Sequence, residues 1–264
     1  MRISYHNHSK WSDGASTLKE MIEQAKKTGI EEFGISDHLI LSPDNRRYSW
    51  ALDADSLDAY VSEVRHLTGT AGDMKIRLGL EVDFFPETVE AVNKRLSEYS
   101  FDYIIGSVHF VDDFVVDLDA RAWEELAQED RNEIWRGYWR HLRAAAETGY
   151  FDIIGHFDLP KKFCRYPSID LTADAIAALD AIASADTAIE INSAGWEKPA
   201  KEAYPAMFYL CEANRRGIPL IINDDAHAAN EVGRNFDRAL RLARRAGYKE
   251  LVRFEQRRRY SYPL

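Results

Sequence analysis

The segment Ile3-Ser4-Tyr5-His6-Asn7-His8 decides how this chain is interpreted, because a short apolar run leads directly into two histidines. The same arrangement returns along the sequence, each time as an apolar run followed by a residue that can bind a metal. The other runs and the residues after them are Phe33–Ile35 with Asp37 and His38, Ile76–Leu80 with Glu81, Tyr103–Ile105 with His109, Ile153–Gly155 with His156, and Leu220–Ile222 with Asp225 and His227. A barrel of parallel strands collects such strand-end residues at its C-terminal mouth. The pattern therefore predicts one shared site.

Strands and helices are expected to alternate along the chain. The predicted strands are Arg2–His6, Glu32–Ser36, Lys75–Val82, Asp102–Val108, Phe151–Gly155, Thr187–Ile191 and Pro219–Asn223, with Leu251–Phe254 as a final edge strand. The predicted helices run from about Ser16 to Gly29, over Asp55–Leu67, from Pro86 as a first-turn proline, and over Glu129–Ala146, Leu171–Ala185, Tyr204–Arg216 and Glu231–Ala246. Ser16 or Thr17 with Glu20 fits a capping box at the start of the first helix. Seven such units with mostly apolar strands imply a parallel sheet covered by helices.

Composition limits the class of protein and its partners. A length of 264 residues without a linker or repeat predicts one domain over residues 1–264. The net charge of -10 argues against a nucleic-acid or anionic-membrane surface, since both need a basic face. It does not exclude an anionic substrate, because bound divalent cations would reverse the local field. Cys164 and Cys211 are expected to be unpaired thiols, and no signal-peptide or membrane-spanning run is seen, so a cytoplasmic location is expected.

The strand-end residues form a ligand set with no thiolate. His6 and His8 are spaced i, i+2, which places both imidazoles on one face of a strand, and Asp225 and His227 repeat this spacing. The candidate metal ligands are His6, His8, Asp13, His38, Glu81, His109, His156, Asp225 and His227. Nine nitrogen and oxygen ligands exceed the four of a structural zinc site. They suit two or three divalent ions such as Zn, Mn or Fe, which the two oxygens of Glu81 could bridge.

Each residue also has an ordinary interpretation. A lone strand-end histidine is usually a surface or satisfied polar residue, and Ser12-Asp13-Gly14 also fits a simple turn. Strand-end ligands on six different units together favour the metal site. The acids beside the ligands are expected at most to orient imidazoles, and helix caps or loop contacts explain them equally well; they are Asp37, Asp83, Asp158 and Asp224.

The chain resembles the PHP (polymerase and histidinol phosphatase) family. The motifs that carry the resemblance are His6-Asn7-His8 with Asp13, Ser36-Asp37-His38, Gly79-Leu80-Glu81, Ser107-Val108-His109, Gly155-His156-Phe157-Asp158 and Asp225-Ala226-His227. The resemblance implies a distorted (β/α)7 barrel, similar to a TIM barrel, with parallel strands surrounded by helices. Within the family the chain looks most like the histidinol-phosphate phosphatases, on features that include Glu190-Ile191-Asn192-Ser193-Ala194-Gly195 before Tyr204-Pro205. This implies hydrolysis of L-histidinol phosphate to L-histidinol and phosphate.

The resemblance also implies roles for individual residues. Its ion sites are His6, His8, Glu81 and Asp225 for the first, Glu81, His109 and His156 for the second, and Asp13, His38 and His227 for the third. A hydroxide bridging two ions would attack phosphorus, and the candidate catalytic residues are Asp13, His38, Asp225 and His227. Glu197 stands where the histidinol phosphatases tend to carry an arginine that helps hold phosphate. The candidate replacements, otherwise part of a solvated face, are Lys161, Lys162, Arg165 and Lys198.

Other functions stay open at this point. The metals could serve another small phosphomonoester, a cyclic phosphodiester or a nucleotide end. An exonuclease or polymerase accessory module is opposed by the acidic charge and the lack of a basic, aromatic-studded stripe, and a non-enzymatic metal-binding barrel is opposed by the complete ligand set. Two long segments after ligand-bearing strands, Leu39–Asp53 and Phe110–Gln128, are expected to shape the mouth. Their Tyr48, Trp50 and Phe114 could pack an imidazole ring of the substrate or merely anchor the loops. The sequence leaves the oligomeric state open.

Overall fold

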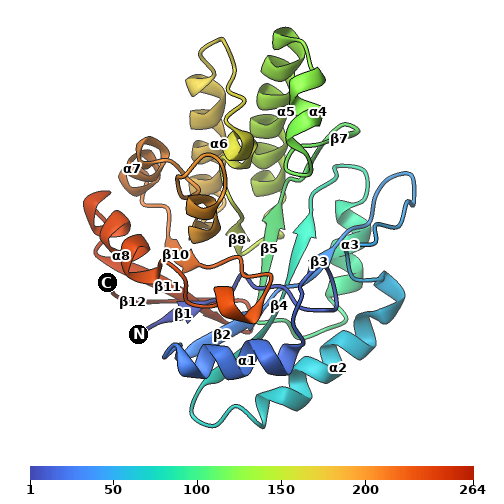
Figure 1. Ribbon diagram of the computed structural model, residues 1–264, viewed down its shortest axis with the longest axis vertical. Coiled ribbons are helices and arrows are strands. Elements are labelled where there is room, and N and C mark those ends of the chain that lie inside the picture. The colour runs from blue at the N-terminus through green and yellow to red at the C-terminus, as the bar shows by residue number, and fades with distance from the viewer.

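Seven parallel strands form a nearly closed barrel in the computed structural model, which describes residues 1–264 (Figure 1). In their order around the barrel the strands are β1 (Ile3–Ser4), β2 (Glu32–Ile35), β4 (Lys75–Asp83), β5 (Tyr103–Ser107), β8 (Ile153–Ile154), β9 (Ala188–Asn192) and β10 (Leu220–Asn223). Each of these seven strands lies beside the one that follows it in this order, as expected for repeated β/α units joined by covering helices. The predicted (β/α)7 barrel is confirmed.

The barrel closes at its C-terminal mouth rather than along its whole height. Strands β1 and β10 are not paired by a regular ladder, but Asn7 forms a parallel bridge with Ala226 just beyond their ends. The backbone N–H of His8 donates to the carbonyl of Ala226 at 2.9 Å, and that of Tyr5 donates to Oδ1 of Asn223 at 2.8 Å. The first and last ligand-bearing segments of the sequence are therefore tied together at the site.

Helices surround the barrel in the expected order. They are α1 (Leu18–Lys27), α2 (Leu57–Thr68), α3 (Val89–Leu96), α4 (Ala120–Glu125), α5 (Gln128–Glu147), α6 (Thr172–Ser184), α7 (Met207–Arg215) and α8 (Phe236–Arg245). Thr17 and Glu20 form the predicted capping box of α1. Figure 1 shows α5 and α6 side by side at the top, extending beyond the strands. No helix combines the length and the apolar character that a membrane span requires.

Three helix starts differ from the prediction. Helix α3 is preceded by its N-cap Thr88, so Pro86 lies outside the helix rather than in its first turn. Helix α7 starts later than predicted because Tyr204 is held by an antiparallel bridge to Asn192. Helix α8 also starts later, because its N-cap residue Asn235 has a φ of 57° and so interrupts the helical conformation.

Two stacked tyrosines fill the middle of the barrel. The rings of Tyr5 and Tyr103 lie 4.7 Å apart between centroids. Gly34 and Gly79 make room for them, since a Cβ atom on either residue would lie 2.2 Å from an atom of the Tyr103 side chain. The tyrosine hydroxyls reach opposite ends: that of Tyr103 donates to the carbonyls of Tyr5 and Ile35, and that of Tyr5 to Glu32. The interior is thus solid below the mouth.

The N-terminal end of the barrel is closed by a hairpin. Strand β11 (Glu250–Glu255) pairs only with β12 (Arg258–Pro263), so the predicted edge strand Leu251–Phe254 does not extend the barrel sheet. The physical reason is that Val252 and Phe254 pack inside the barrel against the same cluster as Tyr5 and Tyr103. Strand β11 therefore fills the N-terminal end of the barrel interior instead of joining its sheet.

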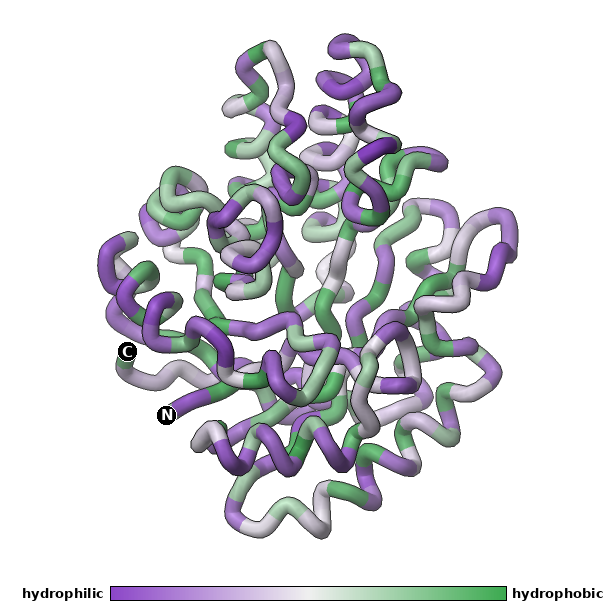
Figure 2. The backbone as a smooth tube through the Cα atoms, in the orientation of Figure 1, coloured by the Kyte–Doolittle hydropathy of each residue, from purple (hydrophilic) through white to green (hydrophobic).

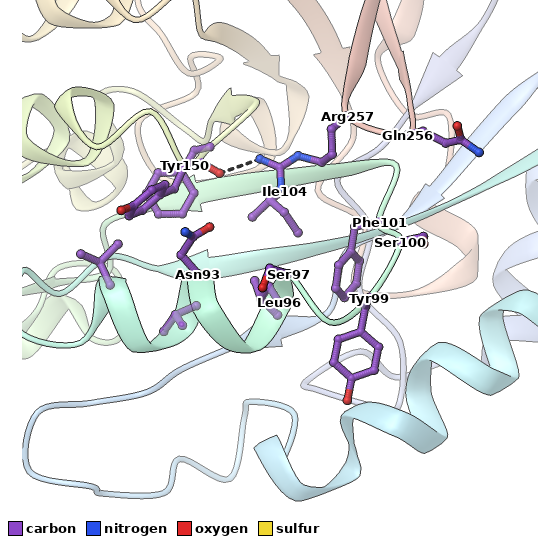
Figure 3. Close-up of a pocket in the computed structure, with 13 residues that line it drawn as sticks. Asn93, Leu96, Ser97, Tyr99, Ser100, Phe101, Ile104, Tyr150, Gln256 and Arg257 are labelled. Carbon is purple, nitrogen blue, oxygen red and sulfur yellow. Dashed lines mark hydrogen bonds between the residues drawn. The ribbon is translucent and has the colours of Figure 1, made fainter.

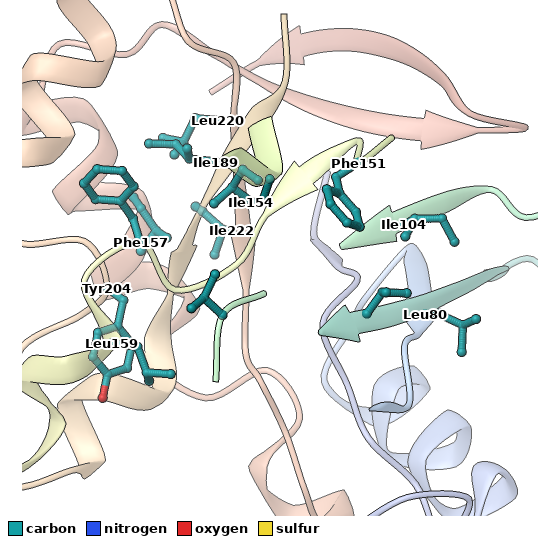
Figure 4. Close-up of a cluster of buried hydrophobic side chains, with 14 of the residues drawn as sticks. Leu80, Ile104, Phe151, Ile154, Phe157, Leu159, Ile189, Tyr204, Leu220 and Ile222 are labelled. Carbon is teal, nitrogen blue, oxygen red and sulfur yellow. The ribbon is translucent and has the colours of Figure 1, made fainter. Parts of the chain in front are cut away.

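The second part of the core lies between the strands and the helices. Figure 4 shows the outward-facing side chains of the strands, including Leu80, Ile104, Ile154, Ile189 and Ile222, within one apolar cluster. In Figure 2 hydrophobic residues follow the central strands and alternate with hydrophilic residues on the surrounding helices. Both faces of the strands are therefore buried, as expected for a parallel sheet.

The two long segments form the walls of the mouth. The first begins with the short strand β3 (His38–Leu39), which pairs with the end of β4. The second contains a hairpin of β6 (Phe110–Val111) and β7 (Phe114–Val115) followed by α4. Neither hairpin nor helix was predicted there, since the elements are short. Trp50 lies against His38 with ring centroids 5.1 Å apart, whereas Phe114 packs on Trp123 and anchors its loop.

Candidate metal centre

Glu81 lies at the centre of the predicted ligands. It is fully buried at the end of β4, and its Oε2 lies 2.8 Å from Nδ1 of His38 and 3.1 Å from Nε2 of His6. Its Oε1 lies 2.9 Å from Nε2 of His156 and 3.7 Å from Nε2 of His109. Four imidazoles from four different β/α units therefore converge on one carboxylate.

Asp13 and Asp225 hold the other half of the cluster. Oδ1 of Asp225 lies 3.3 Å from Nε2 of His8 and 3.4 Å from Nδ1 of His227. Oδ2 of Asp13 lies 3.2 Å from Nε2 of His227, and its Oδ1 lies 3.7 Å from Nε2 of His38. The turn residue Asp13, for which a plain turn was an alternative, lies beside the ligands. All nine predicted residues thus meet at the C-terminal mouth.

Three overlapping groups have ligand atoms within 4.8 Å of one another. They are His8 with Asp13, His38 and His227; His6 with His8 and Glu81; and His38 with Glu81 and His109. Their atoms are nitrogen and oxygen only, a donor set suited to Zn, Mn or Fe. These groups divide the residues differently from the three ion sites implied by the family resemblance, so the assignment of ligands to individual ions stays a prediction.

Buried atoms without hydrogen-bond partners test whether the residues fit metal ions. The buried atoms in the cluster that lack a partner are Nε2 of His6, both ring nitrogens of His8, Nδ1 of His38, Oε2 of Glu81 and Nδ1 of His156. Buried polar atoms are nearly always paired, and leaving one unpaired costs about 1–3 kcal/mol. Several unpaired nitrogen and oxygen atoms in one cluster fit the binding of divalent cations, because a cation would accept the lone pairs that no hydrogen-bond donor satisfies.

The charges in the cluster are strongly coupled. Burial, together with the positive charges of His227 and His38, lowers the pKa of His8 to about 3, so this imidazole is neutral and able to bind a metal. Burial opposes ionisation of Glu81, but His6, His38 and His109 lower the pKa of its carboxyl well below the usual range. Burial also opposes protonation of His109, yet the carboxylates of Asp83 and Glu81 raise its pKa to about 10. Metal binding would displace protons from such imidazoles.

Residues behind the ligands fix their rings. Asp83 meets its expected role, because its Oδ1 lies 2.9 Å from Nδ1 of His109. Asp37, Asp158 and Asp224 do not contact a ligand imidazole: Asp37 accepts from Ser9 and Ser12, Asp158 pairs with Lys161, and Asp224 accepts from the backbone of Gly233.

The sequence interpretation missed Glu190 as a site residue. This fully buried carboxylate lies 3.0 Å from Nδ1 of His6 and accepts from the backbone N–H of His156 at 2.8 Å. Its neighbour Asn192 donates to Oδ2 of Asp225 at 2.9 Å. An acid inside the apolar strand β9, two residues before an asparagine on the same face, was the available signal.

A cavity of about 330 Å³ opens above the cluster. Its lining residues outside the ligand set include Trp50, Val115, Asp117, Leu159, Lys162, Lys198, Tyr204 and Glu231. Lys162 and Lys198, two of the four candidate phosphate-binding residues, therefore line this cavity, and their role in binding phosphate stays a prediction. The Lys162 ammonium is 3.0 Å from Oδ2 of Asp117, whereas Lys198 forms no salt bridge to a carboxylate.

Lys161 and Arg165 do not line the cavity, contrary to the prediction. The ammonium of Lys161 is buried and lies 2.9 Å from carboxylate oxygens of both Asp158 and Glu202. Arg165 pairs with Glu124 on α4. Charge alone could not indicate the direction of these side chains. Glu197 likewise points elsewhere, since its Oε1 accepts from Asn235 at 2.9 Å and it is outside the cavity lining.

A second cavity, of about 430 Å³, lies beside α3 and the turn of the hairpin (Figure 3). Its lining includes Leu96, Phe101, Ile104 and Arg257, whose guanidinium donates to the carbonyl of Tyr150 at 2.7 Å. It contains no imidazole or carboxylate side chain. The groups of side chains that could hold a metal ion lie instead at the strand ends.

A parallel barrel whose mouth gathers imidazoles around buried carboxylates defines a metal-binding (β/α) barrel protein. A family model described as "PHP domain" matches residues 4–194, which is most of the chain. The chain belongs to the PHP domain family, as its motifs indicated.

Individual relatives agree with this assignment. A Deinococcus radiodurans protein named "Probable histidinol-phosphatase" is 36% identical over 234 residues, which is 88% of each chain. The "Histidinol-phosphatase" of Bacillus subtilis is 29% identical over 252 residues, covering 86% of this chain and 94% of that protein. A crystal structure of histidinol phosphate phosphatase from Lactococcus lactis, described as complexed with Zn, L-histidinol and phosphate, superposes with a TM-score of 0.83 over 98% of both chains at 23% identity. That likeness establishes the fold.

Proposed function

We propose that this chain hydrolyses L-histidinol phosphate to L-histidinol and phosphate, using two or three divalent ions at the Glu81 cluster. The observation that carries the proposal is the convergence of nine candidate ligand residues in one cluster, seven of which line a cavity together with Lys162 and Lys198. Relatives with the printed name histidinol-phosphatase, which this chain matches over most of its length, support the choice of substrate.

The ligand residues would hold the ions in three overlapping groups around Glu81. When bound, divalent ions supply a hydroxide nucleophile at neutral pH and neutralise charge on phosphoryl oxygens. Glu190 and Asp83 hold the imidazoles of His6 and His109 so that the opposite ring nitrogen faces the cluster. Asp13, His38, Asp225 and His227 remain the proposed catalytic residues, of which one protonates the leaving oxygen.

Lys162 and Lys198 are the proposed phosphate-binding side chains of the protein. Both side chains line the cavity, where a phosphoryl group would lie beside the ligand cluster, and the Lys162 ammonium is held by Asp117 on the same lining. Glu197 does not oppose the phosphate, because it is turned to Asn235. Trp50 also lines the cavity and is the proposed aromatic contact for the imidazole ring of the substrate. A cytoplasmic location stays a prediction.

The direct test is phosphate release by the purified protein loaded with Mn or Zn. A panel should contain L-histidinol phosphate, other small phosphomonoesters, a cyclic phosphodiester and a nucleotide. We expect the highest kcat/KM with L-histidinol phosphate, and a clear preference for another ester would redirect the substrate while keeping the metal chemistry.

A pair of variants tests the phosphate site. Lys198→Ala should raise KM by about tenfold, since a hydrogen bond to a charged group contributes about 1.5–3 kcal/mol. Arg165→Ala should leave KM unchanged, because its guanidinium is held by Glu124 outside the cavity. Equal effects of the two substitutions would contradict the assignment.

A further inference from the structure

Tyr204, which lines the cavity beside the metal cluster, has a hydroxyl group with no assigned role. The side chain is buried, with 1% of its surface exposed, and it lines the cavity beside the metal cluster. Its oxygen has no hydrogen-bond partner within the protein. Buried tyrosine hydroxyls usually find a partner, because an unpaired one loses its hydrogen bonds to water without replacement.

Close contacts hold both the backbone and the ring of Tyr204. Its backbone exchanges two hydrogen bonds with Asn192, of 2.7 and 3.1 Å. Gly195 lies against the ring, where an added Cβ would be 3.0 Å from a ring carbon. The ammonium of Lys161 lies over the other part of the ring at 5.3 Å from its centroid and donates to the carbonyl of Ala203 at 2.7 Å. This contact gives Lys161 a structural role.

The ring of Tyr204 lies beside the candidate ligands. Figure 4 shows the ring of Tyr204 below the apolar cluster, with its oxygen turned away from the side chains of Ile189 and Ile222. The ring meets that of the candidate ligand His156 edge to face at 6.5 Å. A phenol is protonated at neutral pH, so this hydroxyl can act as a hydrogen-bond donor.

We propose that the Tyr204 hydroxyl donates a hydrogen bond to a phosphoryl oxygen of the substrate. A phosphoryl group supplies charged acceptor oxygens, and two other donors that line the same cavity, Lys162 and Lys198, favour the same anion. The inference rests on the proposed phosphatase function, which it deepens by adding a neutral donor to the two ammonium groups. Tyr204 is then a substrate-binding residue whose hydrogen bond is formed only when the phosphoryl group is present.

The test compares Tyr204→Phe with Tyr248→Phe. Tyr248 is the matched control because its hydroxyl is also buried without a partner but lies outside the cavity lining. Since neither hydroxyl bonds to the protein, both variants should unfold at the temperature of the wild type or slightly above. Both should also keep the wild-type metal content, measured by elemental analysis.

The two variants should differ in phosphate binding. For Tyr204→Phe we expect kcat/KM to fall about 10- to 100-fold, as for loss of a hydrogen bond to a charged group. The Kd of inorganic phosphate, measured by calorimetry on the Mn-loaded protein, should rise about tenfold or more in the same variant. Tyr248→Phe should match the wild type in both measurements.

Two outcomes would overturn the inference. Unchanged phosphate affinity in Tyr204→Phe would mean that the hydroxyl has no phosphoryl partner, whether or not kcat/KM falls. Equal losses in Tyr248→Phe would show a general effect of removing a buried hydroxyl. Absence of turnover of L-histidinol phosphate by the wild-type protein would instead contradict the proposed function, and the phosphate-binding comparison would still decide the role of Tyr204.

Discussion

Replacing Glu190 by glutamine should weaken metal binding without changing any ligand. Both carboxylate oxygens of Glu190 accept hydrogen bonds in the buried space behind the site. Oε1 accepts from the backbone N–H of His156 at 2.8 Å and from Nδ2 of Asn192 at 3.1 Å. Oε2 accepts from Nδ2 of Asn223 at 2.7 Å and lies 3.0 Å from Nδ1 of His6. A glutamine amide has only one acceptor oxygen, so its NH2 group would face at least one other donor.

The size of the effect follows from this arrangement. Asn223 cannot turn its amide to relieve the clash, because its Oδ1 already accepts from the backbone of Tyr5 at 2.8 Å. At least one buried donor is left unpaired, which costs about 1–3 kcal/mol of folding stability. The ring of His6 also loses the carboxylate that orients it. Removal of such an orienting partner typically lowers metal affinity about 10- to 100-fold, or about 1.4–2.7 kcal/mol.

The assay is competition for Zn between the protein and a chelating dye, with thermal unfolding recorded with and without the metal. Glu212→Gln is the matched control, since Glu212 is a buried glutamate on α7 whose partners are Arg215 and Arg216. We expect both variants to lose stability and only Glu190→Gln to lose affinity. A wild-type Kd for Zn in Glu190→Gln would refute the role of Glu190.

Three other predictions follow from the same geometry. Chelation with EDTA should abolish turnover and Mn or Zn should restore it. His8→Ala should lower kcat about 1,000-fold even with added metal, because an ion that would stabilise the charge of the transition state loses a ligand. Gly79→Ala should lower the free energy of unfolding by about 1–3 kcal/mol or more in urea titrations, because its Cβ would lie 2.2 Å from the Tyr103 ring; Gly69→Ala, with 3.7 Å of clearance, should not. Burial raises the pKa of Asp152 to about 6, so the free energy of unfolding should be highest below about pH 4 and should fall as the pH rises through 6. In urea titrations at several pH values, Asp152→Asn should remove about 1–3 kcal/mol of this pH dependence. An unchanged pH profile in the variant would contradict the prediction.

Sequence reasoning located the barrel strands because their apolar runs are bounded by polar residues. The longest, β4, was predicted as Lys75–Val82 and observed as Lys75–Asp83. The elements that it missed are short or polar on most of their surface. Strand β12 is mainly exposed, so no apolar pattern marked it as the partner of β11. Strand β11 closes the end of the barrel because Phe254 packs in the same cluster as Tyr5. This contact joins residues far apart in the sequence, so the local sequence pattern could not predict it.

The ligands were predictable because each follows a strand whose direction is fixed by the fold. The supporting residues were harder to identify. Lys161 was predicted to bind phosphate, but it follows Asp158 by three residues in a tight turn, and that spacing places the ammonium 2.9 Å from the carboxylate. Glu190 was overlooked because a single acid in an apolar strand does not reveal which imidazole it will meet. Both cases depend on contacts between distant segments.

The glycines of the barrel interior connect the fold to the chemistry. The Tyr103 hydroxyl donates to the carbonyls of Tyr5 and Ile35. Tyr5 directly precedes the candidate ligand His6, and Ile35 lies three residues before His38. Its ring reaches them only because Gly34 and Gly79 leave room. A side chain at either glycine would shift the ring and, with it, the backbone from which two ligands project. The metal centre is therefore held from below by aromatic packing as well as from behind by Glu190, and a substitution far from any ligand atom can disturb it.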